Sequence, residues 1–266
     1  MNYFFDVNHW LGNDDHCFQD QEDSQANKEM IKKIRKRFDQ NNIKKCIITS
    51  KLALGYDWKT GNNSLLNTCL SKSMEGIYYG LVLNPDVYFR YDFIDYLKEA
   101  FKSDVRLLRI FPRSQLFYLN DHYMKSIYKI LSEKKFPVML DLKQLDITGN
   151  KYFDIDVLDK ILSKNTDMPF ILETTLKQCM FSRYYFPLLE QFKNLYLEVS
   201  NLLLYNQIEH YVEKFGSDRL IFGTNYPNLP IEINTARIDL SDISEEDKEN
   251  ITHRNIEKII DEIEID

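Results

Sequence analysis

Polar and charged side chains recur at the points where short apolar runs of this chain end. They are Asn8, Arg109, Asp141, Glu173, Thr174 and Asn225, accompanied by the indole of Trp10. Two of them, Asp141 and Glu173, are carboxylates that could act as general acid and base if their surroundings separate their pKa values. The guanidinium of Arg109 could stabilise an anion beside them. This set suits either a catalytic site or a polar pocket that recognises a small molecule.

Cysteine and serine chemistry finds little support in the sequence. There is no G-x-S-x-G motif, and Cys179 has no recognisable histidine partner. The four cysteines are widely scattered without a C-x-x-C pair, which argues against a disulfide framework and against a structural zinc site.

Short β-branched or aromatic runs alternate with longer amphipathic segments along the chain. The sequence predicts strands at Tyr3–Trp10, Ile43–Ser50, Ile77–Asn84, Val105–Phe111, Pro137–Leu142, Phe170–Thr175, Leu195–Ser200 and Leu220–Asn225. It predicts helices at Lys28–Gln40, Ser64–Ser73, Tyr91–Lys102, Asp121–Glu133, Asp154–Ser163, Tyr184–Phe192, Gln207–Phe215 and Glu245–Ile263.

Eight such units predict an α/β fold, a single-domain (β/α)8 TIM barrel over residues 1–266. The strands are apolar on both faces, as expected where helices cover one side and packed interior side chains fill the other. The glycine-rich phosphate turn of an open nucleotide-binding sheet is missing from the sequence. Because the carboxyl ends of barrel strands meet at one mouth, we expect the polar residues above to converge there.

The composition excludes some classes of function. A formal charge of -7 disfavours nucleic-acid binding, which needs a clustered positive surface. No apolar run reaches membrane-spanning length and no secretory leader is recognisable, so we expect a cytoplasmic protein without membrane contact.

The strand ends resemble the amidohydrolase-related (amidohydrolase 2) family, whose members are mostly metal-dependent hydrolases and decarboxylases. Phe5–Trp10 is similar to the strand-one motif I-D-x-H-x-H, and Leu108–Pro112 looks like the fourth strand. Leu220–Pro227 resembles the strand-eight signature L-x-F-G-S/T-D-Y-P, and Ile251–Ile260 resembles the closing helix. The resemblance spans almost the whole chain and implies a TIM barrel.

The resemblance also implies a metal site that these residues do not complete. The family binds its metal through two strand-one histidines, one histidine each from strands five and six, and a strand-eight aspartate. The corresponding positions here are Asn8, Trp10, Asp141, Thr174 or Glu173, and Asn225. An indole offers no lone pair to a metal and a neutral amide is a weak ligand, so we predict no transition-metal site and no cofactor.

His9 and Asn225 decide two further possibilities, a surviving metal ligand and a metal-free general base. Neighbours on a strand point to opposite faces, so if Asn8 and Trp10 face the pocket, His9 faces the helices as a packed, hydrogen-bonded side chain. Some metal-free relatives use the strand-eight aspartate as a general base. Asn225 cannot accept a proton at neutral pH, so that route is also closed.

Three functional hypotheses follow. The first is a pseudoenzyme whose mouth binds a small molecule or partner through Asn8, Trp10, Arg109, Asp141, Thr174 and Asn225, or keeps these residues as a vestigial pocket. The second is a metal-free hydrolase or decarboxylase working through Asp141 and Glu173, although Arg109 is expected to pair with Asp141. The third is an oxygen-ligated Mg²⁺ or Ca²⁺ at Asp141, Glu173 and Asn8. Association into homo-oligomers or with another protein fits each of them.

Overall fold

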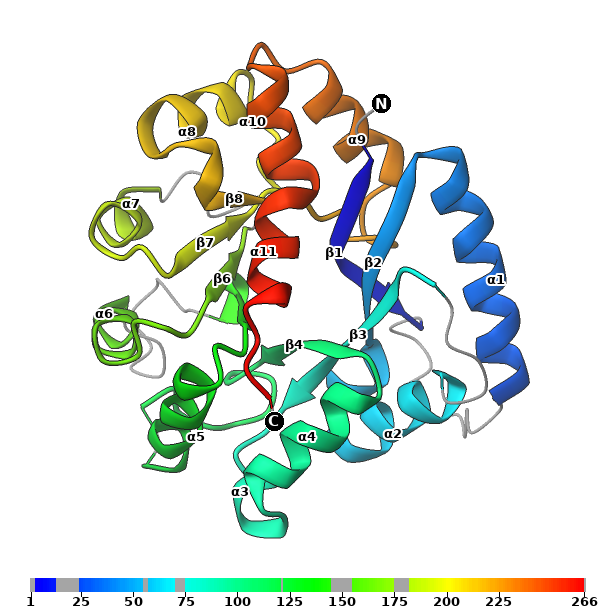
Figure 1. Ribbon diagram of the computed structural model, residues 1–266, viewed down its shortest axis with the longest axis vertical. Helices are drawn as coiled ribbons and strands as arrows, with labels where there is room; N and C mark the ends of the chain where they lie inside the picture. Colours follow the sequence, from blue (N-terminus) through cyan, green and yellow to red (C-terminus); the bar gives the residue numbers. More distant parts are fainter. Residues whose placement is uncertain are drawn as a thin grey trace.

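The computed structural model describes residues 3–12, 24–54, 57–69, 75–120, 122–144, 155–174 and 182–265. Eight parallel strands form one sheet in the order β1 to β8, and helices surround it as a (β/α)8 barrel (Figure 1). The strands are β1 Phe4–Leu11, β2 Ile43–Ser50, β3 Ile77–Leu83, β4 Val105–Ile110, β5 Val138–Asp141, β6 Phe170–Glu173, β7 Leu195–Glu198 and β8 Leu220–Ile221.

Helices follow the strands and form the outer layer (Figure 1). They are α1 Ser24–Gln40, α2 Trp58–Cys69, α3 Val87–Arg90, α4 Phe93–Lys102, α5 His122–Glu133, α6 Ile155–Lys164, α7 Ser182–Gln191, α8 Gln207–Phe215, α9 Ile231–Asp239, α10 Glu245–Glu249 and α11 Asn255–Asp261. A π-helical turn, Asn250–Arg254, joins α10 to α11.

Backbone hydrogen bonds between β1 and the segment around β8 close the barrel. The Val7 N–H donates to the Phe222 carbonyl at 3.2 Å, and the Trp10 N–H donates to the Tyr226 carbonyl at 2.9 Å. His9 also forms a parallel bridge with Tyr226. The first and last strands are therefore joined although some 215 residues separate them in the chain.

Asp6 strengthens this closure with its side chain. Its fully buried carboxylate accepts hydrogen bonds from the backbone N–H of Thr224 at 2.8 Å, from the Thr224 hydroxyl at 2.6 Å and from the backbone N–H of Asn8 at 3.0 Å. A buried backbone N–H needs an acceptor. Asp6 is that acceptor on both sides of the seam, the line along which β1 meets the segment after β8.

Inward-facing apolar side chains fill the barrel. This inner core comprises Phe5, Val7, Ile47, Leu107, Met139, Ile171 and Ile221, together with Ile256 and Ile259 of the last helix. Helix α11, red in Figure 1, therefore covers the amino-terminal end of the strands. The polar residues Arg109, Asp141, Glu173 and Glu198 lie at the opposite end of the barrel, where the strands finish.

Several observed elements differ from the prediction: the short helix α3 was not predicted, β7 and β8 end earlier than expected, and helices α2 and α9 differ most. Helix α2 begins at Trp58 rather than Ser64, because Asp57 accepts hydrogen bonds from the N–H groups of Lys59 and Thr60, and Gly61 allows close packing against Ala53. Helix α9 was not predicted because Asn234 and Thr235 interrupt the apolar stripe between Ile231 and Ile238 on its buried face.

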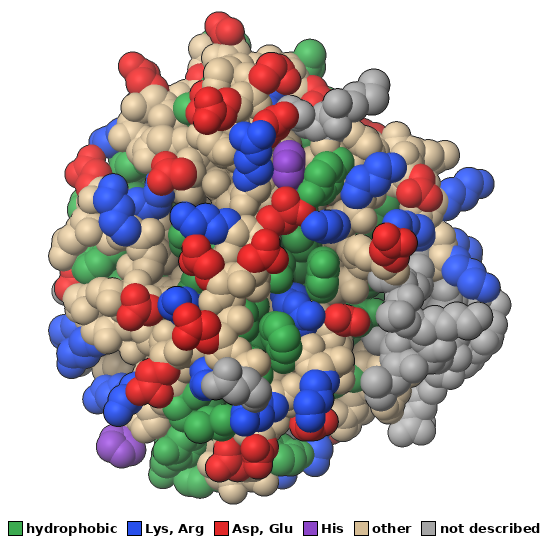
Figure 2. Space-filling view, viewed as in Figure 1, with side chains coloured by type: hydrophobic (Ala, Val, Ile, Leu, Met, Phe, Trp, Pro, Cys, Tyr) green, Lys and Arg blue, Asp and Glu red, His purple; other side chains and the backbone are tan. Residues whose placement is uncertain are grey.

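Figure 2 shows acidic and basic side chains interspersed over the face that α11 crosses. Among the described residues, no helix combines the length and the apolar character that crossing a lipid bilayer requires.

We expect Asp6→Ala to lower the free energy of unfolding by about 2–4 kcal/mol, because two buried N–H groups lose their acceptor. Asp6→Asn keeps one acceptor oxygen of the same shape and should cost clearly less. Urea denaturation of both variants measures the difference. Equal losses would contradict the role assigned to the carboxylate at the seam.

Candidate functional site at the barrel mouth

A fully buried arginine lies at the centre of the polar cluster. Arg109 of β4 donates from Nη1 to the Asn8 Oδ1 at 3.0 Å and from Nη2 to the Glu173 carboxylate. Its guanidinium carbon lies 4.0 Å from the ring centre of Trp10, as in a cation–π contact. One cation thus contacts β1 and β6 from β4, across the inside of the barrel.

An irregularity in β1 brings Asn8 into this cluster. The β1–β2 pairing changes register between Asp6 and His9, so Val7 lies in the inner core and Asn8 also reaches inward. The Asn8 amide is engaged at both ends, because its oxygen accepts from Arg109 and its nitrogen donates to Glu198 at 3.4 Å.

Three carboxylates stand side by side on neighbouring strands. Asp141 is the register partner of Glu173, and Glu173 is the register partner of Glu198. Only Glu173 forms an ion pair with Arg109. Charge repulsion along this row favours protonation of its other members.

Glu198 is the functional-site residue that the sequence analysis missed. Its fully buried carboxylate accepts from the backbone N–H of Ser200 at 2.8 Å and from the Ser200 hydroxyl at 2.9 Å. Burial, then the charge of Glu173, raises the pKa of Glu198 well above its usual range. A Cβ at Gly223 would lie 2.2 Å from the Glu198 Oε1, so this glycine makes room for the carboxylate.

Asp141 is the partly exposed member of the row. Burial, then the charge of Glu173, raises its pKa to about 7, although its Oδ1 accepts from the Lys143 N–H at 2.7 Å. A carboxyl group that titrates near neutral pH can both accept and release a proton.

The expected pairing of Arg109 with Asp141 is wrong, since the ion-pair partner is Glu173. Arg109 lies opposite Met139 in the β4–β5 register, so Asp141 stands two residues further along β5. The glutamate side chain is longer and reaches back to the guanidinium. Strand alternation agrees, because Ile171 faces the inner core and Glu173 follows it by two residues.

Thr174 directly follows β6 and Asn225 lies in the segment after β8, and both side chains form hydrogen bonds with neighbouring loops. The Thr174 hydroxyl donates to the Glu198 carbonyl at 2.9 Å and accepts from the Asn201 N–H at 3.2 Å. Asn225 has a left-handed backbone with φ of 54°, and its side-chain oxygen accepts from Asn228 at 2.8 Å. Both side chains shape the loops around the mouth.

His9 faces the helices, as the sequence analysis predicts, because the irregularity between Asp6 and His9 reverses the side from which β1 presents its side chains. Its Nδ1 lies 3.3 Å from the Asp6 carboxylate, and its ring contacts Phe38 of α1 edge-on and stacks with Tyr226. This side of the strand is opposite to the one from which Asn8 contacts Arg109.

The donor set does not fit a transition metal. Within the described ranges, no three His, Cys, Asp or Glu side chains gather in a way that could hold a metal ion. The Asn8 amide forms hydrogen bonds with Arg109 and Glu198, and the Arg109 guanidinium lies over the face of the Trp10 ring. The positive charge in the cluster is therefore that of Arg109, and we derive no chemical step through a metal.

A groove of about 680 Å³ opens beside the mouth, between the segments that follow β2, β3 and β4. Its lining includes Trp58, Asn84, Phe89, Gln115, Phe117 and Tyr123. Asn84 directly follows β3, so the groove lies at the same end of the barrel as Arg109. The lining also includes the charged residues Asp57, Lys59, Asp86 and Arg90. Small-molecule sites typically have roughly 300–1,000 Å³ and combine aromatic with polar side chains.

Comparison with known proteins agrees with this fold. A family model described as Amidohydrolase matches residues 62–261. No curated protein matches the chain.

Solved structures match over nearly the full length. A 2,6-dihydroxybenzoate decarboxylase in complex with 2,6-dihydroxybenzoate has a TM-score of 0.73 and 11% identity over 98% of both chains. A dihydroxybenzoic acid decarboxylase from Polaromonas sp. JS666, with bound manganese and 2-nitroresorcinol, has a TM-score of 0.72 and 13% identity over 98% of this chain and 97% of that one. The 5-carboxyvanillate decarboxylase LigW from Sphingomonas paucimobilis has a TM-score of 0.67 and 10% identity over 98% of this chain and 99% of that one.

The Arg109–Glu173 pair predicts a strong asymmetry between variants. Glu173→Gln leaves a buried guanidinium without its counter-charge and should lower the free energy of unfolding by roughly 3–5 kcal/mol. The double variant Arg109→Met/Glu173→Leu should lose less than the sum of its single changes. The exposed pair Arg90–Asp86 is the control, since Asp86→Asn should cost under about 1 kcal/mol. Denaturant titrations of these variants measure their free energies of unfolding. If the losses of the two single variants add up to that of the double variant, the pairing is contradicted.

Asp141 predicts a pH dependence of stability. Its folded pKa of about 7 lies above its ordinary value of 3.8, so the fold stabilises the protonated form. This contribution is complete below pH ~4 and is lost as the pH rises through ~7. Asp141→Asn, which mimics the protonated group, should lack that decline and exceed the wild type in stability above neutral pH. Thermal melts across this range provide the test, and parallel profiles would refute the assignment.

Proposed function

The chain belongs to the amidohydrolase family, and from that premise we propose that it is a member without metal chemistry, a pseudoenzyme that binds a small molecule at the barrel mouth. The supporting observation is the position of Arg109. Its guanidinium touches Asn8, Trp10 and Glu173, three of the positions at which the resemblance places metal ligands. A permanent cation attached to the chain takes the place of an exchangeable divalent one.

The chemistry of the two cations differs. A divalent metal polarises a carbonyl or carboxylate and lowers the pKa of a bound water, because it has open coordination positions. The guanidinium has neither property, and its Nη1 and Nη2 groups already donate hydrogen bonds to Asn8 and Glu173. It can fix the shape and charge of the mouth. Recognition of a ligand therefore fits the cluster better than metal-assisted turnover.

The ligand would meet Asp141 and the groove beside the mouth. Asp141 is the partly exposed acceptor of the carboxylate row, and the groove offers aromatic faces together with the amides of Asn84 and Gln115. These side chains suit a small aromatic molecule with hydrogen-bond donors.

A second candidate is metal-free acid/base catalysis, and the pKa of Asp141 favours it. A carboxyl with a pKa of about 7 can donate or accept a proton at neutral pH. Such a site could support hydrolysis or decarboxylation of a small substrate without a metal. An oxygen-ligated Mg²⁺ or Ca²⁺, a cytoplasmic location and association with further subunits stay predictions.

Metal content and turnover separate these proposals. The protein is incubated with Mn²⁺ or Zn²⁺, freed of unbound metal, analysed by mass spectrometry, and assayed for decarboxylation of 2,6-dihydroxybenzoate with and without EDTA. We expect far less than one metal per chain and no turnover. Stoichiometric Mn²⁺ with EDTA-sensitive turnover would overturn the proposal. EDTA-resistant turnover that Asp141→Asn abolishes would establish the second candidate instead.

Binding is tested with 2-nitroresorcinol as the probe, titrated calorimetrically into EDTA-treated protein. We expect binding by the wild type and weaker binding by Asp141→Asn, which keeps the shape of the side chain but loses its charge. Asp239→Asn, on α9 and outside the mouth, is the matched control and should bind as the wild type does. No binding by the wild type would argue against an aromatic ligand at the mouth.

A further inference from the structure

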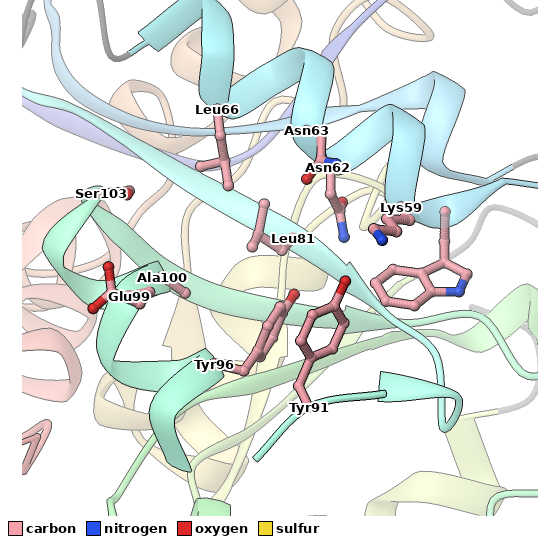
Figure 3. Close-up of a pocket in the computed structure, with 11 residues that line it drawn as sticks. Lys59, Asn62, Asn63, Leu66, Leu81, Tyr91, Tyr96, Glu99, Ala100 and Ser103 are labelled. Atoms are coloured by element: carbon pink, nitrogen blue, oxygen red, sulfur yellow. The ribbon is translucent and has the colours of Figure 1, made fainter. Parts of the chain in front are cut away.

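A second cavity, of about 130 Å³, lies between α2 and α4 over the outer surface of β3 (Figure 3). Leu81 of β3 forms its floor, and Leu66 and Ala100 form apolar sides. Leu81 belongs to the core outside the barrel, whereas Arg109 lies inside it, so this cavity is separate from the mouth.

Two tyrosine hydroxyls give this apolar cavity its polar end. The rings of Tyr91 and Tyr96 lie 5.9 Å apart, and Figure 3 shows both hydroxyls pointing toward α2. No hydrogen bond joins the Tyr96 hydroxyl to a described residue, and the nearby Asn62 amide is committed to the Val82 backbone at 2.8 and 3.0 Å. Burial raises the pKa of Tyr96, which keeps its hydroxyl neutral. A hydroxyl at the end of an apolar cavity can exchange a hydrogen bond with a ligand that carries a hydroxyl of its own.

The charged groups lie at the rim. The Lys59 Nζ lies 5.5 Å from the ring centre of Tyr91, and Glu99 is exposed on α4. These two groups carry opposite charges, so the rim selects neither an anion nor a cation. The apolar interior adds a desolvation cost for any charged ligand.

We propose that this cavity binds a small neutral aromatic molecule that carries a hydroxyl group. The aromatic ring would lie against Leu66, Leu81 and Ala100, and its hydroxyl would hydrogen-bond to Tyr96. The volume is close to the ~150 Å³ of an apolar protein cavity that accepts benzene. The hydroxyl requirement distinguishes this site from a simple packing gap, which would accept any ring of that size.

The test compares phenol with toluene, which has the same size but no hydroxyl, on wild-type protein and three variants. Ala100→Leu fills the cavity, Tyr96→Phe removes the hydroxyl, and Tyr118→Phe removes an exposed hydroxyl elsewhere as the control. Calorimetry measures affinity, and methyl NMR shifts of Leu66 and Leu81 locate the ligand. Circular dichroism checks the fold of each variant, and Leu66→Phe is the second filling variant if Ala100→Leu does not fold.

We expect phenol to bind the wild type and Tyr118→Phe equally, to bind Tyr96→Phe about 2- to 10-fold more weakly, and not to bind the filled variant. Toluene should bind the wild type and Tyr96→Phe alike. Failure of phenol to shift the Leu66 and Leu81 methyls would overturn the proposal, as would an equal loss of both ligands in Tyr96→Phe. Because Arg109 plays no part here, these outcomes are independent of the function proposed for the mouth.

Discussion

The organisation of the barrel mouth depends on compensating one buried positive charge. A guanidinium removed from water costs several kcal/mol unless a counter-ion and hydrogen-bond acceptors surround it. Arg109 has both in Glu173 and Asn8, and the face of Trp10 adds a cation–π contact. Side chains from β1, β4 and β6 are thereby committed to holding one guanidinium at the mouth.

Neutralising Arg109 with Glu173 has consequences for the rest of the carboxylate row. Asp141 and Glu198 lie on either side of the carboxylate that pairs with Arg109, and burial followed by the charge of Glu173 raises the pKa values of both. Glu198 is satisfied by Asn8 and Ser200 inside the barrel. Asp141 reaches the solvent, so it is the group through which the cluster can meet a ligand or exchange a proton.

Much of the fold could be predicted from periodicity, because strands buried on both faces and amphipathic helices have clear signatures. The bounds of β2 and α8 agree with prediction. The site was harder, since it depends on where a strand stops. The prediction ended β7 at Ser200, whereas the strand ends at Glu198, so the buried carboxylate of Glu198 was not recognised as a strand-end residue. Pairing Arg109 with Asp141 ignored the register between strands, which a single sequence does not contain.

Anomalous diffraction from crystals soaked in MnCl₂ tests the central claim most directly, because it locates the metal and the guanidinium together. The account predicts no manganese peak among Asn8, Asp141 and Glu173, with the Arg109 side chain lying between Asn8 and Glu173 over the Trp10 ring. A manganese ion bound there, with Arg109 turned away, would contradict it.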